Sequence, residues 1–156
     1  MICYLDSNAL VKLFIEEPGS LEVGQAIRSA HLVGTVAISR AEVVATFGKA
    51  FRLGLLSQKG AEAARHQFST EWRHYWQVRV SDSLIEQAAG LSWSHRLRGY
   101  DSVQLAAAIA WQESLGIPVS LITFDVRLWE ASGRAGLDPY PQDLPKLRES
   151  WKAALA

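Results

Sequence analysis

Ile2-Cys-Tyr-Leu5, followed at once by Asp6, has the pattern of a short buried strand with an acid at its carboxyl end. Val119-Ser-Leu-Ile-Thr-Phe124, followed by Asp125, repeats this pattern late in the chain. Continuous apolar runs of this length are typical of parallel sheets that are covered on both faces. If the two strands are neighbours, their acids lie at the same sheet edge, where α/β proteins form their sites.

Strands and helices alternate between these two stretches. Residues 32–38 and 76–80 have the β-branched or alternating patterns of two more strands, and apolar residues at helical spacing predict the helices. The predicted helices are 9–15, a segment around 21–27, 39–53, 57–75, 82–96, 101–115 and 126–135. The alternation predicts an α/β fold with a central parallel sheet and helices on both faces. After Gly136, three prolines predict irregular structure with at most a terminal helical turn.

Composition narrows the class of protein. The 156 residues are 49% hydrophobic and 21% charged, as expected for one globular domain. No apolar run approaches the roughly 20 residues of a membrane span, so we expect no membrane association. The single Cys3 permits no internal disulfide, and together with the lack of a secretory signal pattern it favours a cytoplasmic protein. The 16 basic and 16 acidic residues exclude nucleic-acid binding by bulk positive charge.

Four acids stand where an apolar segment gives way to a helix, namely Asp6, Glu42, Asp101 and Asp125. Taken singly, each has a structural explanation as a helix cap, and Ser39 with Glu42 has the spacing of a capping box. Taken together, the four would repel one another at one sheet edge unless a cation were present. Carboxylates without histidine or cysteine suit a hard cation, Mg²⁺ or Mn²⁺.

The stretches around these acids resemble the signature stretches of a known family. They are Tyr4-Leu-Asp6-Ser-Asn-Ala-Leu-Val-Lys-Leu-Phe14, Ser39-Arg-Ala-Glu42-Val, Arg98-Gly-Tyr-Asp101-Ser-Val-Gln-Leu-Ala106 and Ile122-Thr-Phe-Asp125-Val-Arg-Leu128. In this order they look like PIN-domain ribonucleases, and most closely like the VapC-type toxins of prokaryotic toxin–antitoxin modules. The resemblance implies a three-layer α/β/α PIN domain, which we expect over residues 1–147, with 148–156 as a C-terminal tail.

The resemblance also implies roles for individual residues. Asp6 and Asp101 would be the principal metal ligands, and Glu42 and Asp125 would complete the acidic pocket and orient the attacking water. The supporting residues would be Ser7, Asn8 and Thr123, which can hold carboxylates and metal-bound waters by hydrogen bonds. Position 8 is Asn where Ser is commoner in the family.

The expected activity is that of a Mg²⁺- or Mn²⁺-dependent endoribonuclease that hydrolyses phosphodiester bonds of single-stranded or loop RNA. The resemblance implies the toxin of a type II toxin–antitoxin pair, with a cognate antitoxin protein as partner. Candidate phosphate contacts flank the acidic motifs, namely Lys12, Arg40, Arg96 and Arg98, although ordinary surface solvation explains them as well. Two alternatives stay open, a catalytically silent PIN-like binding module and a PIN nuclease that acts on DNA or in RNA processing.

An aromatic stripe leads to one further expectation. Four aromatic residues recur at helical spacing, namely Phe68, Trp72, Tyr75 and Trp76. Such a stripe either packs within the domain or forms a protein interface. With six Trp in the chain and the family resemblance, we expect a homodimer.

Overall fold

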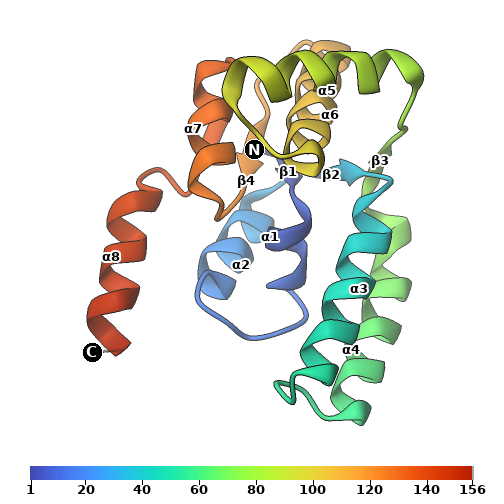
Figure 1. Cartoon of the computed structure of the whole chain (residues 1–156), viewed down its shortest axis with the longest axis vertical. Helices are drawn as coiled ribbons and strands as arrows, with labels where there is room; N and C mark the ends of the chain where they lie inside the picture. The colour runs from blue at the N-terminus through green and yellow to red at the C-terminus, as the bar shows by residue number, and fades with distance from the viewer. Residues whose placement is uncertain (156) are drawn as a thin grey trace.

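A sheet of five parallel strands in the order β3-β2-β1-β4-β5 divides the molecule into two helical layers (Figure 1). The structure is a computed structural model that describes residues 1–155. The strands are β1 (Ile2–Leu5), β2 (Leu32–Val36), β3 (Trp76–Val78), β4 (Ser120–Ile122) and β5 (Asp138–Tyr140). The predicted parallel α/β architecture is therefore confirmed.

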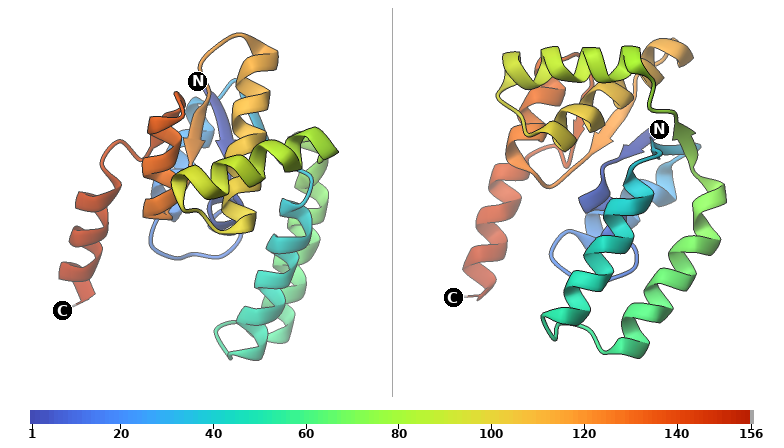
Figure 2. Two further views of the ribbon diagram at one scale, coloured as in Figure 1. Left: turned by 45° about the horizontal axis from the view of Figure 1, so that its top comes forward. Right: turned by 45° about the vertical axis from the view of Figure 1, so that its right-hand side comes forward.

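Eight α-helices surround the sheet within the described residues. They are α1 (Ser7–Val11), α2 (Ser20–Ser29), α3 (Ser39–Arg52), α4 (Gln58–Glu71), α5 (Asp82–His95), α6 (Gly99–Leu115), α7 (Val126–Arg134) and α8 (Leu144–Leu155), with a 3₁₀ turn at Trp72–His74. The first four helices and α8 share one core cluster, and α5, α6 and α7 share the other. Figure 2 shows α3 and α4 side by side as a hairpin that reaches beyond the sheet. None of the helices described over residues 1–155 has the length and apolarity to cross a membrane.

Alternation along the central strand separates the two cores. Tyr4 belongs to the cluster with α5, α6 and α7, whereas Cys3 and Leu5 belong to the cluster on the opposite face, and all three are fully buried. This two-residue period is what a strand covered on both faces requires.

Close packing of α6 on the sheet depends on a glycine in β2. A Cβ atom at Gly34 would lie 2.6 Å from the Trp111 ring, so no larger residue fits without movement. Ala106, Ala107 and Ala108 on α6 are fully buried, and their small side chains allow the helix to approach the sheet. This approach determines how far Asp101, at the start of α6, lies from the strand ends.

The segment after Gly136 differs from the prediction of irregular structure. It forms the edge strand β5 and the helix α8, and the expected boundary between residues 147 and 148 falls inside α8. The prolines are compatible with this structure because Pro139 lies on an edge strand and Pro145 lies in the first turn of a helix, two places that tolerate proline.

The aromatic stripe packs mainly within the domain. Phe68 is fully buried and makes edge-on contacts with Phe14 and Phe47, at centroid distances of 5.3 Å and 6.1 Å. Trp72 is also buried and stacks edge-on against Phe68. Trp76, which is 57% exposed, is the stripe residue that faces solvent most. Phe68 and Trp72 therefore cannot support an interface, because core packing uses them.

Candidate active site

The carboxyl ends of β1 and β4 meet at the point where the strand order reverses. Leu5 pairs with Ile122, so the next residues, Asp6 and Thr123, lie side by side. The Thr123 hydroxyl donates a hydrogen bond of 2.6 Å to Asp6 Oδ2, and the Ala9 amide donates one of 2.6 Å to Asp6 Oδ1. Asp6 is therefore fixed both as the N-cap of α1 and as a member of the sheet edge.

Asp125 likewise follows a strand, β4, and caps the next helix. Its Oδ1 accepts a hydrogen bond of 3.0 Å from the Leu128 amide, which makes it the N-cap of α7. Its own amide donates to Thr123 Oγ1 over 3.2 Å. Thr123 therefore links Asp6 and Asp125 through one buried hydroxyl.

Glu42 reaches the same place from α3, and the capping box that was its structural alternative does not form. The N-cap of α3 is Ile38, and Ser39 lies inside the helix with its hydroxyl buried. The Glu42 carboxylate instead accepts hydrogen bonds from the Ser7 hydroxyl and, over 3.3 Å, from Gln104 Nε2. The interpretation of Ser39 and Glu42 as a capping pair was therefore wrong, because both side chains turn toward the sheet edge.

Gln104 lines the same cavity, although the sequence did not single it out. Its amide nitrogen lies 2.9 Å from Ser7 Oγ and 3.0 Å from Ser39 Oγ, and its oxygen accepts a hydrogen bond of 2.8 Å from the Tyr4 hydroxyl. The sequence signal was a lone amide in the otherwise apolar stretch of α6. The N-cap of α6 is Arg98, so Asp101 is not the cap that its place at the start of this helix suggested.

The four acids line one cavity of about 380 Å³. They come from different elements, and Asp101 lies in the first turn of α6. Ser7 and Asn8 of α1 also line this cavity, with Asn8 exposed. The structure thus brings together all four acids and, through Thr123 and the two α1 residues, their expected supports.

The electrostatics of the cavity are those of crowded acids. Burial raises the pKa of Asp6 to about 7, since its hydrogen bonds from Thr123 and Ala9 only partly oppose burial, and Asp101 and Asp125 raise it further. Burial, and then the charge of Asp125, also raises the pKa of Asp101, against the lowering effect of Arg98. The site therefore favours a bound proton or a bound cation over four free carboxylates.

The four carboxylates have the ligand chemistry that a hard divalent cation prefers. Within residues 1–155, no group of three or more acidic, histidine or cysteine side chains is spaced so that it could hold a metal ion. The four carboxylates nevertheless line one cavity, and oxygen ligands with several waters are the surroundings that Mg²⁺ prefers. In chemistry, the residues present therefore fit a partly hydrated Mg²⁺ or Mn²⁺.

The four basic residues expected to contact phosphate do not all lie at the acidic cavity. Arg98 borders the acidic cavity, while Arg40 stacks over the Trp72 ring and Arg96 lies beside Trp93 in a separate hollow. Lys12 is only 9% exposed, and its ammonium group pairs with Glu17 at 2.6 Å. Of the four, Arg98 is the one beside the acids and open to solvent.

Comparisons with known proteins agree with this geometry. The family model described as PIN domain matches residues 3–133. Ribonuclease VapC46 of Mycobacterium tuberculosis is 33% identical over 135 residues, which cover 86% of this chain and 92% of that protein. Ribonuclease VapC45 of the same species is 27% identical over 143 residues, covering 92% and 97%. A solved toxin–antitoxin complex from Klebsiella pneumoniae matches with a TM-score of 0.57 at 18% identity, covering 79% of this chain and 86% of that chain.

Proposed function

This chain belongs to the PIN-domain family, among its VapC-type ribonucleases, and on that premise we propose that its four clustered carboxylates hold Mg²⁺ or Mn²⁺ for RNA hydrolysis. The observation that carries the proposal is the meeting of Asp6, Glu42, Asp101 and Asp125 in one cavity at the reversal of strand order. This placement is where parallel sheets bind their ligands.

A divalent cation held by these carboxylates would supply charge stabilisation for the phosphodiester and would lower the pKa of a water molecule. The residues of the chain hold the carboxylates in position. Thr123 and the Ala9 amide hold the Asp6 carboxylate, so its orientation does not depend on the cation. Ser7 and Gln104 hold one oxygen of Glu42 and leave the other free to accept a hydrogen bond from the attacking water.

The expected substrate is single-stranded or loop RNA. The scissile phosphate must reach a cavity that lies between helix termini, and an unpaired strand can enter such a cavity more readily than a stiff duplex. Arg98 stands at the border of the cavity, where it can contact a phosphate oxygen.

We further propose that the chain is a toxin with a cognate antitoxin as its partner, and that it acts as a homodimer. The Klebsiella pneumoniae structure is described as a toxin–antitoxin complex, which supports the partner. For the homodimer, the aromatic stripe no longer gives support, but Ile85 and Tyr100 remain 45% and 57% exposed beside a largely apolar hollow on α5 and α6.

The test is cleavage of an end-labelled single-stranded RNA with Mg²⁺, with Mn²⁺ and in excess EDTA. We expect cleavage only with a divalent cation, loss of cleavage in Asp101→Asn, and no change in Asp143→Asn, an exposed helix cap outside the cavity. A DNA strand of the same sequence should remain intact. Cleavage in EDTA at the same rate would refute the metal mechanism, and equal cleavage of the DNA would refute the preference for RNA.

A further inference from the structure

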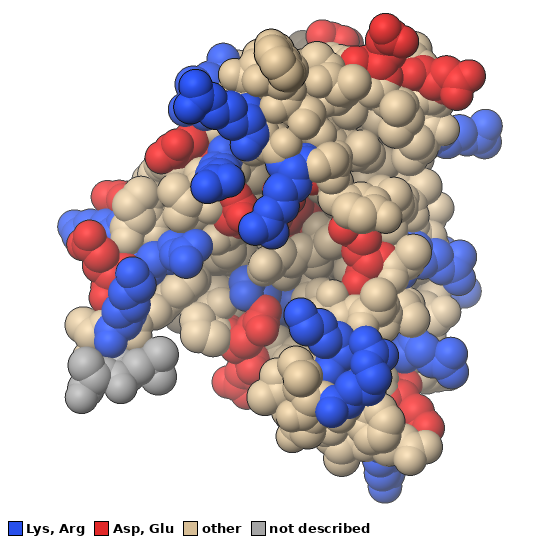
Figure 3. Space-filling model, viewed as in Figure 1, with Lys and Arg blue, Asp and Glu red and all other residues tan. Residues whose placement is uncertain are grey.

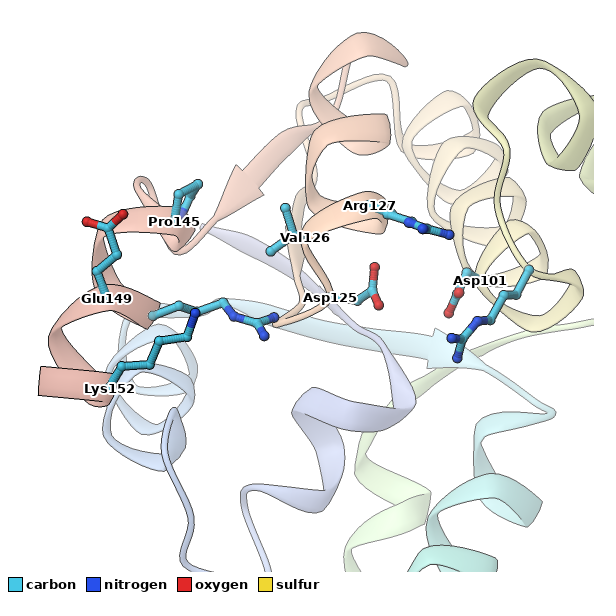
Figure 4. A pocket seen from close by; sticks show the side chains of 9 residues that line it. Asp101, Asp125, Val126, Arg127, Pro145, Glu149 and Lys152 are labelled. Carbon is cyan, nitrogen blue, oxygen red and sulfur yellow. The ribbon is translucent and has the colours of Figure 1, made fainter. Parts of the chain in front are cut away.

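A second cavity of about 490 Å³ continues from the acidic one toward the C-terminal helix (Figure 4). It shares Arg98, Asp101 and Asp125 with the acidic cavity, so the two form one cleft. Its other lining residues are Val126, Arg127, Pro145, Arg148, Glu149 and Lys152. Figure 3 shows the same face of the molecule hollowed near its centre, with acidic atoms inside the hollow and basic side chains around it.

Three basic side chains line this extension without acidic partners. We call Arg127 of α7 and Arg148 and Lys152 of α8 the basic arm. Within residues 1–155 the ion pairs are Lys12 with Glu17 and Glu130 with Arg134, and neither involves the arm. In Figure 4, Arg127 points toward Asp101 and Lys152 extends toward the cleft, whereas the Glu149 carboxylate points away from it.

The basic arm is tied firmly to the acidic cavity. Leu144 is fully buried, and the Trp151 ring lies 5.9 Å from the Phe124 ring. Arg148 also donates a hydrogen bond of 3.2 Å to the carbonyl oxygen of Phe124, the residue before Asp125. Because a guanidinium group has five N–H donors, Arg148 retains donors for a second partner. The whole of α8 lies beyond residue 133, where the match to the family model ends.

The charges around the acidic cavity favour one exit. Within residues 1–155, Arg98 is the one basic residue in its lining, Glu17 and Glu42 line it as well, and the nearby Lys12 pairs with Glu17. A phosphate backbone that leaves the carboxylates is therefore repelled by Glu42 and attracted by the basic arm. Arg148 and Lys152, four residues apart, are separated by about 6 Å along the helix axis, which suits successive phosphates of an extended strand.

We propose that the basic arm binds the phosphates of the RNA strand on one side of the scissile bond, so that the strand runs from the carboxylates across α7 and along α8. This inference rests on the proposed ribonuclease function. RNA is favoured over an acidic protein segment because the arm is continuous with the carboxylates, where the scissile phosphate itself must lie. The phosphate contacts then come mainly from the C-terminal helix rather than from Lys12, Arg40 and Arg96.

The first experiment measures binding of a labelled single-stranded RNA to the full chain in EDTA, at several salt concentrations. For single strands, each phosphate contact contributes about 0.7 to the slope of log affinity against log salt. We expect the double variant Arg148→Gln/Lys152→Gln to lose about 1.4 from that slope and to bind more weakly. Lys146→Gln, an exposed lysine on the same helix that does not line the cleft, is the matched control and should bind like the wild type.

A second variant keeps the test independent of folding. Lys152→Gln removes an exposed ammonium group and none of the contacts that hold α8, and it should lose about 0.7 from the slope. Cleavage with Mn²⁺ gives a further readout. The double variant should have a raised KM for a long RNA with little change in kcat, and a smaller rise in KM for a dinucleotide, which carries no second phosphate for the basic arm.

The outcomes separate this inference from the proposed function. A wild type that binds RNA with the expected slopes but never cleaves it would refute the ribonuclease mechanism and leave the basic arm supported. A wild type that cleaves, with variants whose affinity and slope equal those of Lys146→Gln, would refute the basic arm. Unchanged RNA binding together with weakened binding of an acidic antitoxin segment would assign the surface to a protein instead and would also overturn the proposal.

Discussion

Replacing Asp6 by asparagine should stabilise the metal-free protein while abolishing its activity. The substitution keeps the shape and both hydrogen bonds of the side chain. Asparagine is as good an N-cap as aspartate, so its oxygen can accept from the Ala9 amide, and its amide can donate to the Thr123 hydroxyl. The charge is then the main property that changes.

The size of the effect follows from burial. The pKa of Asp6 rises from 3.8 to about 7 because the carboxyl is only 5% exposed and lies near two other acids. Three pKa units correspond to a free energy of up to about 4 kcal/mol. The folded state holds the proton between pH 3.8 and about 7 while the unfolded state releases it, so wild-type stability falls as pH rises through this window. Asp6→Asn escapes this loss.

Urea unfolding in EDTA measures the difference. At pH 4 both proteins are uncharged at position 6, and we expect nearly equal stability. At pH 8 the Asp6→Asn variant should be more stable by a few kcal/mol, up to the ceiling of about 4 kcal/mol set by the pKa. Added Mn²⁺ at 100 times its dissociation constant should stabilise the wild type by about 2.7 kcal/mol and the variant much less, which narrows the gap.

Asp143→Asn provides the control, because Asp143 caps α8 through the Lys146 amide but is exposed and lies outside the cleft. It should show no pH-dependent gain of this kind. If Asp6→Asn were destabilised equally at pH 4 and pH 8, the cost assigned to the buried charge of Asp6 would be wrong. Equal stabilisation of the wild type and Asp6→Asn by Mn²⁺ would refute Asp6 as a metal ligand.

Three further predictions concern packing and assembly. Gln104→Leu should lower the free energy of unfolding by about 1–3 kcal/mol, because it leaves the buried Tyr4 hydroxyl without an acceptor. Tyr4→Phe should lower it by less. Equal losses would contradict the view that Gln104 joins several buried groups by hydrogen bonds. Gly34→Ala should destabilise by about 1–3 kcal/mol through collision with Trp111, whereas Gly90→Ala, with open space in α5, should stabilise by about 0.5–1 kcal/mol; urea unfolding that shows the same sign for both would contradict this account. Light scattering of the free chain should give twice 17.2 kDa, and a single-chain mass at micromolar concentration would count against the homodimer.

The sequence was most informative where local pattern and burial coincide. The run before Asp6 and the run before Asp125 predicted two buried strands, and both strands are present. That these two strands are neighbours in the sheet could only be assumed, since nothing in the local sequence specifies which strands of a parallel sheet pair with each other. Their positions at strand ends and helix starts singled out the four acids as a set, the resemblance to a family implied their roles, and the structure places them in one cavity.

Residues that act through distant contacts were the ones that escaped prediction. Gln104 matters because Tyr4 and Ser7, far away in the sequence, meet it across the sheet edge. The basic residues of α8 lie in a segment whose prolines indicated a loop, and their relation to Asp125 depends on the packing of Trp151 on Phe124. Such relations arise from tertiary packing and leave no periodic signal in the chain.

For Asp6 and Asp125, helix capping and metal binding are alternatives in the sequence, yet the geometry allows one residue to do both. Each carboxylate gives one oxygen to the amide of a helix's first turn. In Asp125 the other oxygen carries none of the hydrogen bonds described over residues 1–155, and in Asp6 it is held by Thr123. The capping bonds and the positive ends of α1 and α7 offset part of the repulsion between the acids. Helix capping therefore makes it possible to assemble the acidic site before any cation arrives, and the cost that remains appears as the raised pKa of Asp6.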